Sequence, residues 1–266
     1  MRAFAWWVAR RPWTPLLAAG WLTLVLPLVA AAEPYVGLYA GGAFVNEQDL
    51  DSEIDLGPPF SLSVADGTIK DIELDPGFLF GAKVGYFFDP PILGGHFGVE
   101  LDVHRFENKI GSQTAEFSGT QLGAPFDGPT ELEGGEIEVL AIGLNALYRY
   151  PLLTSPALPR GRLQPYVGIG AGAFIATLKT RTTPLDVNRD LEDTDVQPGF
   201  QLVVGNRVFL TRNIALFVEY KYMHTAEFEF RFREEGTFMG VPVTYTSRDR
   251  ATLSGNQVYG GIAFHW

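Results

Sequence analysis

The side chains that could do chemistry in this chain are mainly carboxylates, because the sequence holds 31 Asp and Glu residues, four histidines and no cysteine. The absence of cysteine excludes thiol nucleophiles, disulfides and cysteine-ligated metals. The sequence also contains no His-Glu-x-x-His motif, no Gly-x-Ser-x-Gly motif and no glycine-rich phosphate loop. We therefore predict no catalytic residue, no metal and no cofactor.

The most unusual acidic stretch has a carboxylate at every second residue over 47–55, and two more acids follow it. The set is Glu47, Asp49, Asp51, Glu53, Asp55, Asp71 and Glu73. Hard divalent cations prefer such oxygen ligands, but an EF-hand loop starting at Asp49 would need glycine at Ile54 and glutamate at Phe60. Two interpretations remain: a solvated acidic loop, or an acidic mouth that binds divalent cations weakly.

A second set of ionisable residues recurs at alternate positions within apolar stretches, as in Val99-Glu100-Leu101-Asp102-Val103. The set is Lys83, Glu100, Asp102, Arg149, Arg207, Glu219 and Lys221. A period of two places residues on the two opposite faces of a strand. These seven residues are therefore expected on one face and their apolar neighbours on the other.

The elements that carry this alternation are eight segments bounded by turn residues. They are 34–45, 74–88, 96–106, 136–150, 163–178, 197–210, 214–230 and 253–266. The connections after the second, fourth and sixth segments are short, whereas 46–73, 107–135, 179–196 and 231–251 are long. Short turns at one rim and long loops at the other are typical of outer-membrane barrels, with the long loops outside.

A soluble eight-stranded barrel is the competing fold. In that fold the polar face would meet water, yet here it is rich in glycine, as at Gly168, Gly170 and Gly172. Small residues suit the crowded interior of a narrow barrel, and this favours the membrane barrel. Charges inside such a lumen must pair, so the seven ionisable residues predict an ion-pair plug, with a gated polar conduit as the alternative.

The first 32 residues resemble a secretory signal, with a basic start, an apolar core over 16–29 and three alanines at 30–32. An uncleaved anchor helix is the alternative. We predict a signal peptide over 1–32 and one barrel domain over 33–266. The net charge of −11 makes nucleic acid a poor partner.

The chain ends on alternating Ile262, Phe264 and Trp266, with no polar tail. This ending, with stretches such as QPYVGIGAGAF (164–174) and LFVEYKY (216–222), resembles the OmpA-like small outer-membrane β-barrel family. The resemblance implies an all-β fold: an eight-stranded antiparallel up-and-down transmembrane barrel with long extracellular loops and short periplasmic turns. In that family the assembly machinery reads the terminal aromatic residue.

We therefore expect a monomeric protein of the bacterial outer membrane that contacts lipid, lipopolysaccharide and the barrel-assembly machinery. A structural or surface-interaction role without catalysis is the leading function. A narrow pore or hydrophobic-solute channel is one alternative. A lipid A-modifying enzyme at the outer rim is the other, although the stretch at His224 lacks the nearby serine of such enzymes.

Overall fold

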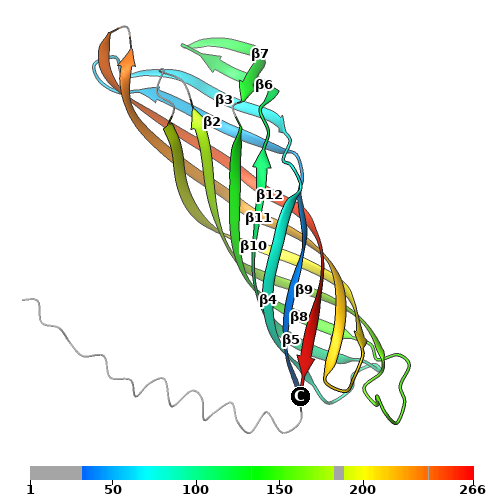
Figure 1. Ribbon diagram of the computed structural model, residues 1–266. Helices are drawn as coiled ribbons and strands as arrows, with labels where there is room; N and C mark the ends of the chain where they lie inside the picture. Colours follow the sequence, from blue (N-terminus) through cyan, green and yellow to red (C-terminus); the bar gives the residue numbers. More distant parts are fainter. Residues whose placement is uncertain (1–31, 133, 183–188, 239) are drawn as a thin grey trace, which may run out of the picture.

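The computed structural model describes residues 32–132, 134–182, 189–238 and 240–266, and every regular element in them is a strand (Figure 1). The strands are β1 (Ala32–Val45), β2 (Gln48–Leu56), β3 (Leu62–Ile72), β4 (Gly77–Phe88), β5 (His96–Ile110), β6 (Gln113–Gln121), β7 (Ala124–Leu132), β8 (Gly135–Arg149), β9 (Leu163–Thr182), β10 (Arg189–Phe209), β11 (Ile214–Phe238) and β12 (Val241–His265). The all-β antiparallel fold is confirmed. The described residues form twelve strands instead of the expected eight, and eight of the twelve close the ring. The expected signal peptide lies outside these residues, except for Ala32.

Strands β1, β4, β5, β8, β9, β10, β11 and β12 pair in that order, and β12 then pairs with β1 to close a ring (Figure 1). The register sets Val36 opposite Phe264, so the predicted pairing of the first and last segments is confirmed. A closed ring leaves no edge strand in the apolar band, and a lipid environment requires this because it cannot satisfy free backbone groups. Among the described residues, no helix is long and apolar enough to cross a membrane.

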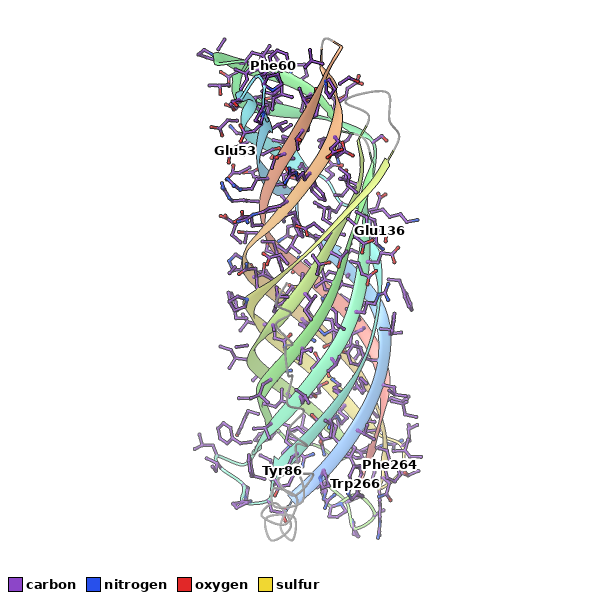
Figure 2. All side chains as sticks on the ribbon, turned by 90° about the vertical axis from the view of Figure 1, so that its left-hand side faces the viewer. Glu53, Phe60, Tyr86, Glu136, Phe264 and Trp266 are labelled. Atoms are coloured by element: carbon purple, nitrogen blue, oxygen red, sulfur yellow. The ribbon has the colours of Figure 1, made fainter. Side chains whose placement is uncertain are left out.

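The ring has two contrasting faces. Apolar side chains such as Leu38, Leu144 and Val218 point outward and are 62%, 62% and 63% exposed. Tyr39 and Lys83, by contrast, are buried inside. Tyr86, Phe264 and Trp266 lie near the end with the short connections, which we call the turn end (Figure 2). We call the opposite end the loop end.

The long connections expected over 46–73 and 107–135 are largely strands, and this is the main correction to the predicted fold. Strand β2 pairs with β12, β3 with β2, β6 with β3 and β7 with β6. The connections expected over 179–196 and 231–251 are mostly continuations of β9–β10 and β11–β12. These segments escaped prediction because polar residues occupy both faces for much of their length, which weakens the alternation.

At the loop end the ring divides into two sheets. The β10–β11 ladder stops at Gly199↔Thr225, while β11–β12 continues to Phe238↔Val241. On the opposite side of the ring, β4 reaches the loop end only as far as Gly77, whereas the β5–β8 ladder continues to Ile110↔Gly135. We call β11, β12, β2, β3, β6 and β7 the long sheet, and β10, β9, β8 and β5 the short sheet. The division creates the space discussed below.

Candidate functional site

The seven ionisable residues predicted for the lumen are all buried inside the ring. On the inner face of β4, Lys83 pairs with Glu219 from β11 and lies 3.5 Å from a carboxylate oxygen of Glu100 on β5. The Lys83 ammonium also lies 4.2 Å from the ring centroid of Phe217. One lysine thus joins two acids from different strands, as charges in a low-dielectric space require.

Neighbouring tyrosines complete the shell of these two acids. Glu219 accepts hydrogen bonds from the hydroxyls of Tyr166 and Tyr259, the latter at 2.6 Å. Glu100 accepts from the Tyr35 hydroxyl at 2.6 Å and from the Asn145 amide at 3.0 Å. Hydrogen bonds to an ionised acceptor are stronger than neutral ones, so these tyrosines help to stabilise the buried carboxylates.

The second cluster is centred on Asp102 of β5. Its carboxylate pairs with Lys221 from β11 and accepts a hydrogen bond from the hydroxyl of Tyr39. The ring of His104 lies on the same inner face, with Nδ1 3.3 Å from the carboxylate. This cluster adjoins the Lys83 cluster in the same lumen, since Asp102 is opposite Lys83 across the β4–β5 ladder. Asp102 and Lys221 each lie two residues nearer the loop end than Glu100 and Glu219 on the same strands.

The third cluster lies at the turn end and contains two residues that the sequence did not single out. Glu33 pairs with Arg149 and lies 2.6 Å from Nδ1 of His265. His265 Nε2 lies 3.1 Å from the guanidinium of Arg207. Glu33 and His265 are 1% and 0% exposed. Their parity matches that of Tyr35 and Tyr259, which is the signal that could have identified them.

Glycine provides the room that the inward tyrosines need. A Cβ added at Gly85 would lie 2.4 Å from the Tyr35 ring, and one at Gly205 would lie 2.5 Å from the Tyr166 ring. The glycine-rich parity of the sequence therefore reflects aromatic rings that cross the lumen, together with the ion pairs. The charges of this interior bind one another. Each of the seven described residues has either an oppositely charged partner or, for Arg207, contact with an aromatic ring.

The seven acids of the acidic-mouth interpretation are exposed or half-buried and do not line the inner face of the ring, an arrangement that favours the alternative of a solvated acidic segment. The strand breaks at Asn46 and Glu47, and β2 restarts against β12. Leu50, Ser52 and Ile54 then face inward, while the alternate acids face outward. A shift of one residue moves every side chain of a strand to the other face. Glu53, labelled at the loop end in Figure 2, belongs to this outward set.

Arginines from β12 accompany these outward acids. Glu53 accepts from Arg248 at 2.8 Å and lies 3.9 Å from Arg250. Asp49 accepts the backbone N–H of Asp71 at 3.2 Å. At Glu53, arginines of the protein thus provide the positive charge that the acidic-mouth hypothesis assigned to divalent cations.

The outer rim offers little that resembles a catalytic or metal centre in the described part of the chain. His224 lies on the lipid-facing parity and its ring packs 5.5 Å from that of Phe200. Glu107, Glu136 and Glu138 are close enough to share an ion. However, Lys179 lies 3.3 Å from Glu136, and Arg105 lies 2.6 Å from Glu138. Those carboxylates already have cationic neighbours.

Backbone hydrogen bonds of the last two residues help to close the ring. The His265 backbone N–H donates to the carbonyl of Asn213 at 2.7 Å, and that of Trp266 donates to Pro34 at 3.3 Å. Ile262, Phe264 and Trp266 point outward and are about half exposed. The predicted C-terminal signature therefore lies on the outer surface at the seam between β1 and β12.

Comparison with known proteins adds one family match. A family model described as outer membrane protein beta-barrel domain matches residues 16–259. The solved structure of OprG from Pseudomonas aeruginosa is 15% identical, with a TM-score of 0.45 over 89% of this chain and 97% of its own. The outer membrane protease OmpT from Escherichia coli is 6% identical, with a TM-score of 0.42 over 89% and 97%. Ail, the attachment invasion locus protein of Yersinia pestis, is 7% identical, with a TM-score of 0.30 over 86% and 99%. No curated protein matches.

Proposed function

Because the chain belongs to the family of outer membrane protein beta-barrel domains, we propose that it is a non-conducting, non-catalytic barrel that presents a β-sheet extension at the bacterial cell surface. The filled lumen carries this proposal. Three clusters of paired charges and the rings of four tyrosines occupy successive levels of the ring. An interior of this kind supports a rigid scaffold for β2, β3, β6 and β7.

The two alternative functions have less support. A narrow pore needs mobile water along the lumen, whereas the lumen charges here bind each other at contact distance. A lipid-modifying enzyme at the rim needs an activated nucleophile, and the aromatic contact of His224 gives the imidazole a packing role. Outer-membrane lipid and lipopolysaccharide are the proposed contacts of the apolar band. The barrel-assembly machinery is the proposed partner of the C-terminal strand, and the closed ring favours a monomer.

A conductance measurement is the direct test of this function. In planar bilayers, the purified protein should give no stable current steps above the membrane background, because opening the lumen requires buried ion pairs to separate. A matched variant, Lys83→Ala with Glu219→Ala, removes one such pair and should conduct more often. Regular steps from the unaltered protein would contradict the proposed closed barrel.

The five lysines of the chain provide a test of orientation. Lys70 and Lys109 are exposed at the loop end and Lys179 is half-buried there, whereas Lys83 and Lys221 are buried in the lumen. A membrane-impermeant amine-reactive biotin should therefore label intact cells if the loop end faces outward. The Lys70→Arg, Lys109→Arg and Lys179→Arg triple variant should lose that label.

Lys179 should react more slowly than Lys70 and Lys109. Its hydrogen bond to Glu136 raises the pKa of its ammonium, so less of the reactive free amine is present at a given pH. Mass spectrometry of the labelled peptides gives the order. Labelling that occurs only after the outer membrane is permeabilised would show that the loop end faces the periplasm.

A further inference from the structure

A cavity of about 480 Å³ lies at the loop end, between the long sheet and the short sheet. The long sheet contributes Ile54, Ile69 and Phe232 to its wall, and the short sheet contributes Leu178 and Leu191. The cavity lies nearer the loop end than the filled part of the lumen, since Phe232 is further along β11 than Lys221, the β11 residue that pairs with Asp102. Its volume falls within the range of ordinary small-ligand sites.

The walls of this cavity are mostly apolar, and part of the wall is shielded from solvent. Phe232 is 5% exposed and Leu178 is 8% exposed, although both lie beyond the ends of the β4 strand and the β10–β11 ladder. A surface of this kind favours an apolar group over water. The two sheets approach each other there without ladder hydrogen bonds, so the space between them is not filled by backbone.

The acidic groups of the cavity distinguish it from a simple hydrophobic pocket. Asp249 of β12 and Glu234 of β11 line it together with Glu131 of β7, and no lysine, arginine or histidine does so among the described residues. Arg248 and Arg250 alternate with Asp249 along the strand and pair with Glu53 on the outer face. The arginines adjacent in sequence are therefore directed away from the cavity.

Asp249 has hydrogen-bond donors but no cationic partner among the described residues. Both donors are hydroxyls on its Oδ1: Ser52 at 2.7 Å and Ser247 at 3.1 Å. Burial raises the pKa of its carboxyl, as expected for an acid that no positive charge compensates. Oε1 of Glu234 is also shielded from solvent and has no hydrogen-bond partner in the described part of the chain.

The register orders these groups along the inner face of the long sheet. Asp249 is opposite Phe230, Ser247 is opposite Phe232, and Tyr245 is opposite Glu234. Four residues of strand therefore separate Asp249 from the level of Glu234, which is about 13 Å. The first acid lies near aromatic rings at the deep end, and the second lies nearer the mouth. An ammonium group is favoured by both a carboxylate and the face of an aromatic ring.

We propose that this cavity binds a hydrophobic amine, with its apolar part between the two sheets and its ammonium against Asp249. The amine provides the positive charge that the cavity lacks, and the apolar walls hold its chain. A fatty acid of the same length would place a carboxylate beside Asp249 or nearer Glu234, and like charges repel at either position. The inference goes beyond the proposed surface role and does not depend on whether the lumen conducts.

The test compares three probes that share an eight-carbon chain and differ in the head group: octylamine, octanol and octanoate. Each is titrated by calorimetry into the full protein in nanodiscs of a zwitterionic lipid, and the heat of the same probe with empty nanodiscs is subtracted. We expect saturable binding of octylamine, at least tenfold weaker binding of octanol, and no binding of octanoate. Equal affinities for the three head groups would overturn the proposal.

The Asp249→Asn variant isolates the carboxylate, because asparagine keeps the shape and can still accept the two serine hydroxyls. It should weaken octylamine binding at least tenfold and leave octanol unchanged. The matched control is Asp51→Asn, which removes the same charge from the outward face of β2 and should bind octylamine as before. Unchanged octylamine affinity in Asp249→Asn would also overturn the proposal.

A cavity-filling variant keeps the test decisive if Asp249→Asn fails to assemble. Ile69→Trp retains all three carboxyls of the wall but fills part of the space between the sheets. It should abolish binding of both octylamine and octanol. If octylamine still binds this variant with the original affinity, the amine binds elsewhere on the protein and the proposed site is wrong.

Discussion

Replacing Lys83 by methionine should lower the free energy of unfolding by about 3–5 kcal/mol, the usual cost of leaving a buried charge without its partner. Methionine fills a similar volume but cannot compensate Glu219 and Glu100, which both lie within 3.5 Å of the ammonium. Tyrosine hydroxyls would remain on both acids, yet they bring no net charge. Reversible denaturant unfolding in detergent or lipid vesicles, followed by circular dichroism, measures the change.

Two further variants show whether the lost charge pair causes this effect. Lys109→Met removes the same charge from an exposed position at the loop end, and it should change the stability by no more than about 0.5 kcal/mol. Adding Glu219→Gln to Lys83→Met should recover part of the loss, because it removes the unpaired buried charge. The amide oxygen can still accept from Tyr166 or Tyr259, which donate to different oxygens of Glu219, and the amide nitrogen can donate to the other tyrosine oxygen. If Lys83→Met and Lys109→Met are equally stable, the ion-pair plug does not stabilise the barrel.

Deleting Phe264–Trp266 should prevent the barrel from closing, so that no heat-modifiable form appears in membrane fractions. The deletion removes the last pairs between β12 and both of its neighbours. It also removes the imidazole of His265, which lies 2.6 Å from Glu33 and 3.1 Å from Arg207. The exposed strand edges that result are templates for aggregation.

Point variants separate closure from recognition by the assembly machinery. His265→Ala removes a fully buried side chain and should cost about 1–3 kcal/mol of stability on refolding in vitro. Trp266→Ser changes a side chain that is 55% exposed and stacks on Phe264 at 5.9 Å. It should refold well in vitro but assemble poorly in cells. Normal cellular levels of the Trp266→Ser protein would argue against recognition of the terminal aromatic residue.

The sequence by itself determined the ring. Alternation in eight segments predicted which residues of each strand face outward, and it placed Lys83, Asp102 and Glu219 on the inner parity where the structure has them. This inference succeeds because lipid on one side and a narrow lumen on the other impose opposite demands on successive residues. Glu33 and His265 also lie on the inner parity. They were not identified from the sequence because each is a single ionisable residue near one end of the barrel, outside any repeated pattern of charges.

Only the tertiary structure decided what happens beyond the apolar band. There, water wets much of the surface, so the alternation no longer identifies an inner face, and β2, β3, β6 and β7 escaped prediction. A break at Asn46 and Glu47 reversed the face on which the acids lie, which brought Glu53 to Arg248 and left Ser52 and Asp249 facing the cavity. Alternation specifies the two faces of a strand but not the strand with which it pairs. The cavity exists because the chain pairs β2 with β12, a choice made by contacts about 195 residues apart in sequence, as for Glu53 and Arg248.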